Sequence, residues 1–99
     1  MAKYLLTNKA VMDLSDIWNY TFETWSEKQA DKYYSMLLDT CKELAEKPNT
    51  GKKYDEVYPN LLGYTAYQHI IFYTVISDKE IEIVRILHSR MNLKSRLSV

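Results

Sequence analysis

The chain has 99 residues, of which 46% are hydrophobic and 26% charged, with only two Gly and two Pro. These values exclude a fibrous or intrinsically disordered chain, and the length predicts one domain spanning residues 1–99. The 13 basic and 13 acidic residues cancel, which argues against a chain that binds DNA by itself through a large positive charge.

The charges are unevenly distributed along the chain. Residues 1–82 carry nine Lys or Arg and all 13 acids, a net charge of −4, whereas residues 83–99 carry a net charge of +4 and no acid. The basic residues of this second segment are Arg85, Arg90, Lys94 and Arg96. The asymmetry indicates either a segment that contacts a negatively charged partner or a solvated basic tail.

Cysteine usage and hydropathy exclude several other classes. The single cysteine, Cys41, has no partner for an internal disulfide, and no His/Cys cluster has the spacing of a zinc site. No segment resembles a secretory signal or approaches the length needed to span a membrane. We therefore expect a cytoplasmic protein that needs no metal, no cofactor and no membrane.

The N-terminal part predicts a strand followed by a helix. Residues 3–7 form a short apolar run, and Thr7 or Asn8 is a candidate N-cap for the helix that follows. An apolar stripe is expected to face the core, formed by Val11, Leu14, Trp18, Phe22 and Trp25. Asp13 and Asp16 lie i,i+3 on the flank of this helix, where a solvated face is expected.

A second helix is predicted directly after the first. Ser26 and Gln29 have the spacing of a capping box, and "PNTG" at residues 48–51 ends the helix. Its expected apolar face is formed by Ala30, Tyr34, Leu37, Cys41 and Leu44. Because almost no linker separates the two helices, they must form a hairpin.

The C-terminal part predicts an antiparallel sheet. Residues 52–60 are expected to form an irregular loop, after which the apolar period becomes two in the runs 63–67, 70–76 and 81–87. Short connections make sequential strands antiparallel. The predicted fold is α+β, with the order β-α-α-β-β-β and the helical hairpin on one face of a small antiparallel sheet.

Both faces of this sheet are apolar. On the last strand Ile81, Ile83 and Leu87 alternate with Val84 and Ile86, yet two helices can cover only one face. The other face is packed by the chain's own loops or is kept for a partner. We favour a partner, because a single small domain has little sequence for another layer.

Three polar residues near the end of the last strand are candidates for a site. Arg85 occupies a position where an apolar side chain is expected, so it needs an acidic partner, for example among the N-terminal acids, or a place at the rim. His88 can titrate near neutrality. In a ribonuclease the catalytic residues would be Arg85, His88 and Arg90. However, no Lys or Arg occurs between Lys53 and Lys79, so the cations that phosphoryl transfer needs are missing there.

Four stretches together resemble a known family. They are "DLSDIWNYTFETWSEKQADKYY" (13–34), "LAEKPNTGKKYDEVYPNLLGY" (44–64), "HIIFYTV" (69–75) and "IEIVRILHSRMNLKSRL" (81–97). With the predicted element order, they resemble the RelE/ParE toxin superfamily and, within it, the ParE toxins of type II toxin–antitoxin (plasmid stabilisation) modules. Ser26 and Gln68 depart from residues common in that family, which bears on specificity rather than on fold.

The resemblance implies a toxin that inhibits DNA gyrase by binding it, without catalysis. It also implies neutralisation by a ParD-like antitoxin with a ribbon-helix-helix domain that carries the DNA binding of the pair. Two alternatives stay open. One is a ribosome-dependent mRNA endoribonuclease of RelE type, and the other is a toxin fold that has lost toxicity.

The residues expected to contact each partner follow from this resemblance and from the exposed apolar face. Gyrase contact is expected from the C-terminal segment, through Arg85, His88, Arg90, Met91, Lys94 and Arg96. Antitoxin contact is expected over the sheet face and beside the helical hairpin, through Tyr20, Tyr33, Ile70, Phe72 and Ile83.

Overall fold

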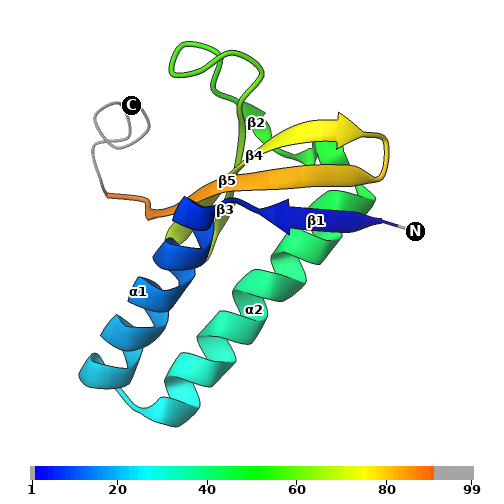
Figure 1. Ribbon diagram of the computed structural model, residues 1–99. Helices are drawn as coiled ribbons and strands as arrows, with labels where there is room; N and C mark the ends of the chain where they lie inside the picture. Colours follow the sequence, from blue (N-terminus) through cyan, green and yellow to red (C-terminus); the bar gives the residue numbers. More distant parts are fainter. Residues whose placement is uncertain (1, 91–99) are drawn as a thin grey trace.

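The computed structural model describes residues 2–90 and has the predicted α+β fold, with a helical hairpin against one sheet (Figure 1). The five strands lie in the order β1-β5-β4-β3-β2. The elements are β1 (Lys3–Leu6), α1 (Asn8–Thr24), α2 (Glu27–Glu46), the 3-10 helix η1 (Pro48–Thr50), β2 (Lys52–Lys53), β3 (Leu62–Ala66), β4 (His69–Ser77) and β5 (Glu80–His88).

The sheet is mostly antiparallel. Strands β3, β4 and β5 are joined by short turns and pair antiparallel, as predicted. Strand β1 lies parallel to β5. This direction is open to it because both helices and strands β2 to β4 separate the two strands in sequence, so no short turn forces them to be antiparallel. The segment predicted as an irregular loop, residues 52–60, begins with the short strand β2, which pairs with Leu62 and Gly63 at the sheet edge.

Helix α1 begins as predicted but buries a different face. The Thr7 Oγ1 atom caps it by accepting a hydrogen bond from the Ala10 amide at 3.0 Å. Of the predicted stripe, Leu14 is buried, Trp18 is partly exposed, and Val11, Phe22 and Trp25 are exposed. The buried positions of α1 are Ala10, Leu14 and Thr21. The stripe prediction was wrong because the small side chains of Ala and Thr, which carry little apolar signal, let α1 pack closely.

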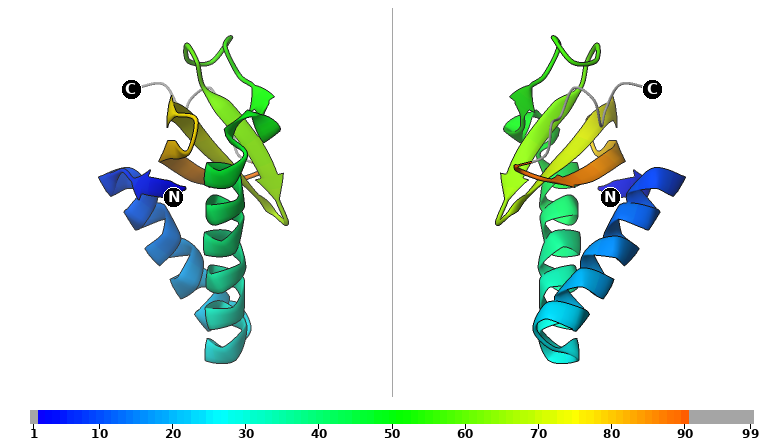
Figure 2. Two further views of the ribbon diagram at one scale, coloured as in Figure 1. Left: turned by 90° about the vertical axis from the view of Figure 1, so that its right-hand side faces the viewer. Right: turned by 90° about the vertical axis from the view of Figure 1, so that its left-hand side faces the viewer.

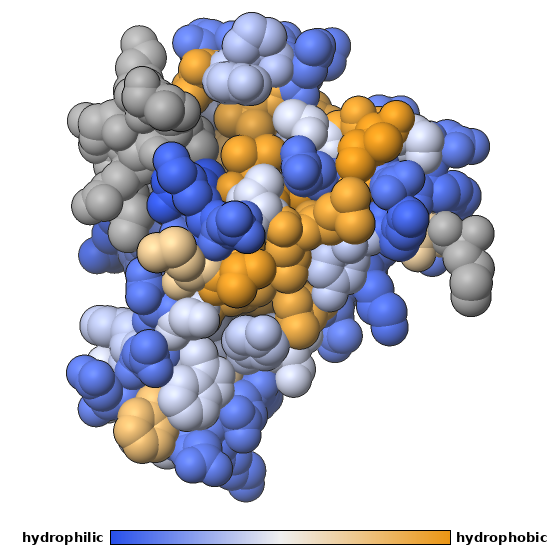
Figure 3. Space-filling model, in the orientation of Figure 1, coloured by the Kyte–Doolittle hydropathy of each residue, from blue (hydrophilic) through white to orange (hydrophobic). Residues whose placement is uncertain are grey.

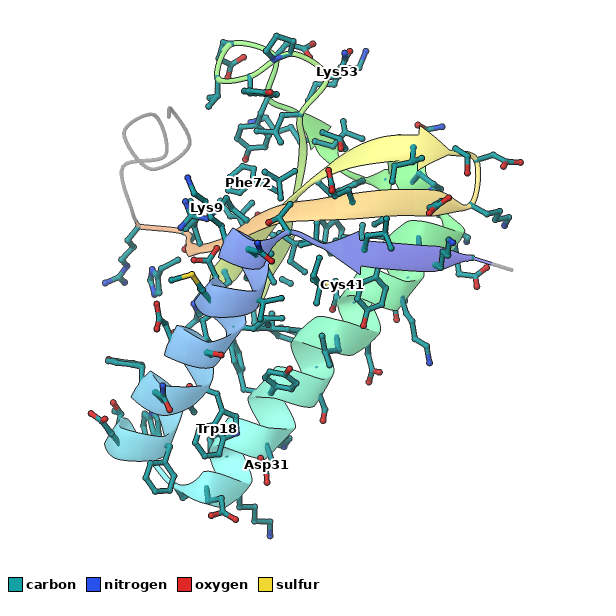
Figure 4. The ribbon with its side chains drawn as sticks, in the orientation of Figure 1. Lys9, Trp18, Asp31, Cys41, Lys53 and Phe72 are labelled. Carbon is teal, nitrogen blue, oxygen red and sulfur yellow. The ribbon has the colours of Figure 1, made fainter. Side chains whose placement is uncertain are left out.

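Helix α2 follows the prediction. Ser26 caps it by accepting a hydrogen bond from the Gln29 amide at 3.1 Å. Its predicted apolar face is buried except for Tyr34, which is partly exposed and packs against the core. The two helices meet at their junction and separate toward the sheet (Figure 2). Near the junction the Trp18 indole of α1 donates a hydrogen bond to Asp31 of α2 at 2.9 Å (Figure 4).

The main core lies between the helices and the sheet. Its strand side chains are Ala66, Ile71, Tyr73, Ile81, Ile83 and Ile86, and its helix side chains include Leu14, Leu37, Cys41 and Leu44. Cys41 points inward from α2 (Figure 4), and burial raises the pKa of its thiol to about 12. Such a thiol stays protonated at neutral pH and is a poor nucleophile.

The regular alternation predicted for the last strand is interrupted in β5. Phe72 pairs with Arg85 but the next residue, Tyr73, pairs with Ile83, so Val84 is an extra residue in β5. This β-bulge changes the faces of the residues that follow it. Ile86 therefore joins the helix-side core and Leu87 the opposite side, whereas strict alternation had placed Leu87 with Ile83.

The face of the sheet that lacks helices is partly covered by the chain itself. The connection 54–61, which lies at the opposite end of the molecule from the helix junction (Figure 1), packs Tyr54, Val57 and Leu61 over this face. Beneath it Ile70, Phe72 and Leu87 form a second core cluster with Leu61. Over this part of the sheet, the chain's own loop covers the apolar face, and the prediction that a partner protein covers it was wrong.

Apolar surface remains elsewhere on the molecule. Leu5 of β1 and Val75 and Ile76 of β4 are 45%, 43% and 51% exposed. Figure 3 shows apolar surface gathered over the strands in this view. Between residues 2 and 90, neither helix combines the length and the apolar character needed to cross a bilayer.

Candidate functional site

The predicted site residue Arg85 is held by an acid from α1. Its Nε and Nη2 atoms donate hydrogen bonds to Asp13 Oδ2 and Oδ1 at 2.8 and 2.9 Å. Both side chains are largely shielded, at 18% and 11% exposure. The hydrogen bonds that Arg85 donates to Asp13 raise the pKa of the Arg85 guanidinium, which stays charged. Pairing with an N-terminal acid was one predicted explanation of Arg85, and the expectation that Asp13 is solvated was wrong.

Asp13 also binds the backbone of β5. Its Oδ2 atom accepts a hydrogen bond from the Ile86 amide at 3.0 Å. Strand β1 pairs with β5 only as far as Ile83, so a carboxylate takes the place of a strand carbonyl beyond that point. We call Asp13, Arg85 and the Ile86 amide the Asp13 clamp.

Beyond the clamp, further hydrogen bonds hold the end of β5. The Ser89 amide donates to the Gln68 carbonyl at 3.0 Å. The Arg90 amide donates to His88 Nδ1 at 3.1 Å, so in this arrangement Nε2 carries the ring proton. His88 is partly exposed and Arg90 is exposed. Both can therefore contact a partner.

His88 and Arg90 line a surface hollow of about 640 Å³, which we call the histidine groove. Its other lining residues come from the C-terminal half of α1, the helix junction, the first half of α2, the β3–β4 turn and the start of β4: Asp16, Ile17, Tyr20, Thr21, Trp25, Gln29, Tyr33, Gln68 and His69. Aromatic and apolar walls with a few polar groups are typical of binding sites. The groove brings together two of the C-terminal candidates, His88 and Arg90, and the two tyrosines, Tyr20 and Tyr33, that the sequence assigned to antitoxin contact.

The second histidine lies beside the first in the groove. His69 pairs with His88 across β4 and β5, and their ring centroids are 5.3 Å apart. Tyr33 Oη lies 2.7 Å from His69 Nδ1 and accepts a hydrogen bond from the Gln68 amide at 3.2 Å. The Tyr33 hydroxyl proton therefore points to His69 Nδ1.

The environment of the groove keeps His69 and Tyr33 neutral. Burial and, to a smaller extent, the neighbouring His88 lower the pKa of His69 to about 4, although Asp13 opposes the shift. Burial also raises the pKa of Tyr33. At neutral pH His69 is thus an uncharged imidazole, which suits hydrogen bonding to a partner better than attracting phosphate.

The five predicted antitoxin contacts separate into two groups. Tyr20 is 69% exposed and Tyr33 lines the groove. In contrast, Ile70, Phe72 and Ile83 are buried in the chain's own cores, at 6%, 0% and 0% exposure. A partner cannot reach these three side chains while the fold is intact. Of the predicted gyrase contacts, Met91, Lys94 and Arg96 lie outside the described residues.

Sequence reasoning did not select Asp13 and His69 as functional residues. Asp13 is 72 residues from Arg85 in the sequence. The one signal that pointed to it was the position of Arg85 in the strand, where an apolar side chain is expected and an arginine needs an acidic partner. His69 could have been found from the register of the last hairpin, which places it opposite His88. No group of three potential metal ligands occurs in the part of the chain that the structure describes.

Comparison with known proteins identifies the family. The sequence model for the ParE toxin of the type II toxin–antitoxin system parDE matches residues 4–93. The chain belongs to the ParE toxin family. It is 33% identical to toxin ParE1 of Mycobacterium tuberculosis over 96 residues, which cover 97% of this chain and 98% of the relative.

Other ParE toxins are similar over their whole length. Toxin ParE1 of Caulobacter vibrioides is 33% identical, with 98% of this chain and 99% of the relative covered. Toxin ParE of Escherichia coli is 32% identical, with 99% and 95% covered. A solved chain of a chromosomal ParDE system from P. aeruginosa shares the fold, with a TM-score of 0.75 and 24% identity over 89% of this chain and 96% of that one. This ParE chain is therefore a toxin of a type II toxin–antitoxin system.

Proposed function

We propose that this ParE toxin inhibits DNA gyrase by direct binding and is neutralised by a ParD-like antitoxin. The proposed gyrase contact is formed by His88 and Arg90 at the end of β5, together with Met91, Lys94 and Arg96. Four basic residues in the last 17 positions, without an acid, favour contact with a negatively charged surface of the enzyme. Arg85, which is bound by Asp13, contributes by holding the end of β5 that carries His88 and Arg90.

The observation that carries this proposal is the contrast between the end of β5 and the central strands. Strands β3 and β4 contain no Lys or Arg, and the Arg85 guanidinium is engaged by Asp13. Cleavage of RNA needs cations around the developing phosphorane, in addition to an acid and a base. An exposed polar strand end beside an aromatic groove is better suited to binding a protein.

A supercoiling assay tests the gyrase proposal. Purified toxin is added to gyrase and relaxed plasmid, and supercoiling and DNA cleavage are measured. We expect inhibition by the wild type and a loss of about tenfold in potency for Arg90→Ala, because interface arginines often contribute 1–3 kcal/mol. Lys53→Ala is the matched control, since it removes a positive charge from β2. Unchanged supercoiling and cleavage with the wild type would contradict the proposal.

A second candidate function is RNA cleavage on the ribosome. The observation that favours it is the pair of histidines 5.3 Å apart in one groove with Arg90. Expression in a sensitive host separates the functions: filamentation with a DNA-damage response supports gyrase, and rapid loss of mRNA supports the nuclease. Normal growth supports a toxin fold without toxicity.

For the antitoxin we propose docking in the histidine groove, through Tyr20 and Tyr33. A helix or an extended segment that places apolar side chains between α1 and α2 would cover the tyrosine rings.

The antitoxin proposal is tested with a matched pair of tyrosine variants. Tyr20→Ala removes an exposed ring at the groove, and Tyr58→Ala removes a ring of similar exposure, 54%, from the connection between β2 and β3. We expect Tyr20→Ala to weaken binding of a co-encoded ribbon-helix-helix protein by about tenfold or more. Equal affinities of both variants and the wild type in calorimetry would place the antitoxin elsewhere.

A further inference from the structure

The course of residues 85–90 depends on few interactions. Beyond Ile83, β5 has β4 on one side, while β1 has ended on the other. Where β1 would continue, Thr7 Oγ1 donates to the Val84 carbonyl at 2.8 Å and Asp13 accepts from the Ile86 amide at 3.0 Å. Beyond the end of β1, the Thr7 and Asp13 side chains therefore provide the hydrogen bonds to β5 that a neighbouring strand would otherwise provide.

Of the two side chains, Asp13 holds β5 more strongly than Thr7 does. It forms a bidentate pair with Arg85 in addition to the backbone bond, and charge-assisted bidentate hydrogen bonds are stronger and more directional than neutral ones. One carboxylate thus fixes both a side chain and the main chain at the β-bulge. His88 and Arg90 follow within a few residues.

We propose that Asp13 is a positioning residue for target binding. By holding Arg85 and the Ile86 amide, it sets the direction of residues 86–90 and so the placement of His88 and Arg90 in the histidine groove. The Asp13–Arg85 pair was a candidate for a purely structural ion pair, but its bond to the strand end connects it to the groove. The gyrase readout of this inference rests on the proposed function. The amide-exchange readout is independent of that function.

The experiment compares Asp13→Asn with Asp31→Asn in the full chain. Both remove a carboxylate that accepts a side-chain hydrogen bond, but the Asp31 bond to Trp18 joins the helices far from β5. Amide hydrogen exchange is measured by NMR for the whole chain, and gyrase supercoiling is measured with each variant. Exchange reports local opening residue by residue.

For Asp13→Asn we expect exchange at the Ile86, Ser89 and Arg90 amides to rise by about tenfold or more while helix α2 keeps its protection. Gyrase inhibition should weaken by about tenfold, as for Arg90→Ala. Asp31→Asn should change neither measurement. Unchanged exchange at residues 86–90 would overturn the proposal, and so would full gyrase inhibition by a variant whose strand end has opened.

A double variant keeps the test decisive if Asp13→Asn does not fold. An uncompensated arginine is costly, so Asp13→Asn with Arg85→Gln removes both charges. In this folded double variant, exchange at residues 86–90 must still rise, whereas wild-type protection there would overturn the proposal. If the wild type leaves gyrase unaffected, the proposed function fails, and the exchange measurement alone still decides whether Asp13 positions the strand end.

Discussion

At the scale of single residues, His69 shows how the fold changes the chemistry of a side chain. Its ring is partly buried between Tyr33 and His88, and its pKa falls to about 4 from the usual 6.5. In the unfolded chain the same ring takes up a proton near pH 6.5. The unfolded state therefore binds more protons than the folded state between these two values.

Stability should consequently fall as the pH drops from 7 to 5. The unfolding free energy should decrease by about 1 kcal/mol over this range because of His69, after allowance for partial exposure of the ring. Urea unfolding at several pH values measures the slope. The variant His69→Gln should have a flatter slope, and equal slopes for both proteins would show that His69 is not the group responsible.

Tyr73 is a second residue whose polar atom has a defined task. Its hydroxyl donates a hydrogen bond to the buried Pro48 carbonyl at 2.7 Å and accepts one from the Gly51 amide at 2.9 Å. The two bonds fasten the 3-10 helix η1, which follows α2, to β4. Burial raises the pKa of Tyr73, so the hydroxyl stays protonated and able to donate.

Tyr73→Phe should lower the unfolding free energy by about 1–3 kcal/mol, because it leaves two backbone groups without their partner. Chemical denaturation measures the change. Tyr20→Phe removes an exposed hydroxyl and serves as the control with no expected effect. A Tyr73→Phe protein as stable as the wild type would mean that water replaces the hydroxyl at no cost.

At the scale of elements, the connection 54–61 packs closely against β3 because β3 has a glycine, Gly63, at the point of contact. A Cβ atom at Gly63 would lie 2.7 Å from Tyr54 Cε1 and 3.1 Å from Phe72 Cε1. The Tyr54 and Phe72 rings pack edge to face with centroids 5.2 Å apart. The small core under the connection therefore requires glycine at this position.

Gly63→Ala should destabilise the protein by about 1–3 kcal/mol through overpacking. Adding Tyr54→Ala should recover part of the loss, because the ring that meets the new methyl group is gone. A double-mutant cycle by chemical denaturation measures this coupling. Strictly additive effects of the two substitutions would contradict the contact.

The elements also show how far sequence periodicity carries. Helix α2 and the antiparallel strands β3 to β5 follow directly from apolar spacing and short turns. The face of α1 was missed because Ala10 and Thr21 are buried without being large and apolar. The shift at Val84 was missed because an inserted residue in a strand leaves no mark in an otherwise apolar run.

At the scale of the whole molecule, charge is separated along the chain, with −4 in residues 1–82 and +4 in residues 83–99. If the basic end contacts gyrase, salt should weaken the interaction, since the Debye length falls from about 10 Å at 0.1 M to about 3 Å at 1 M. Raising NaCl from 50 to about 300 mM should slow association more than it speeds dissociation.

Surface plasmon resonance with immobilised gyrase measures both rates. Arg90→Ala should show a smaller dependence of the association rate on salt, and Lys53→Ala should match the wild type. An association rate independent of salt would show that the basic end does not guide the encounter.

The sequence by itself determined the order of the elements apart from the short η1 and β2, the family and the basic C-terminal end, because these depend on local periodicity, motifs and composition. The tertiary structure decided the rest: that a loop covers Ile70 and Phe72, that Asp13 holds Arg85 from 72 residues away, and that His69 meets His88 beside Tyr33. These contacts join residues distant in sequence, and their partners are set by how the helices and strands pack. Periodicity identifies which side of an element is apolar, but packing decides what each side chain meets.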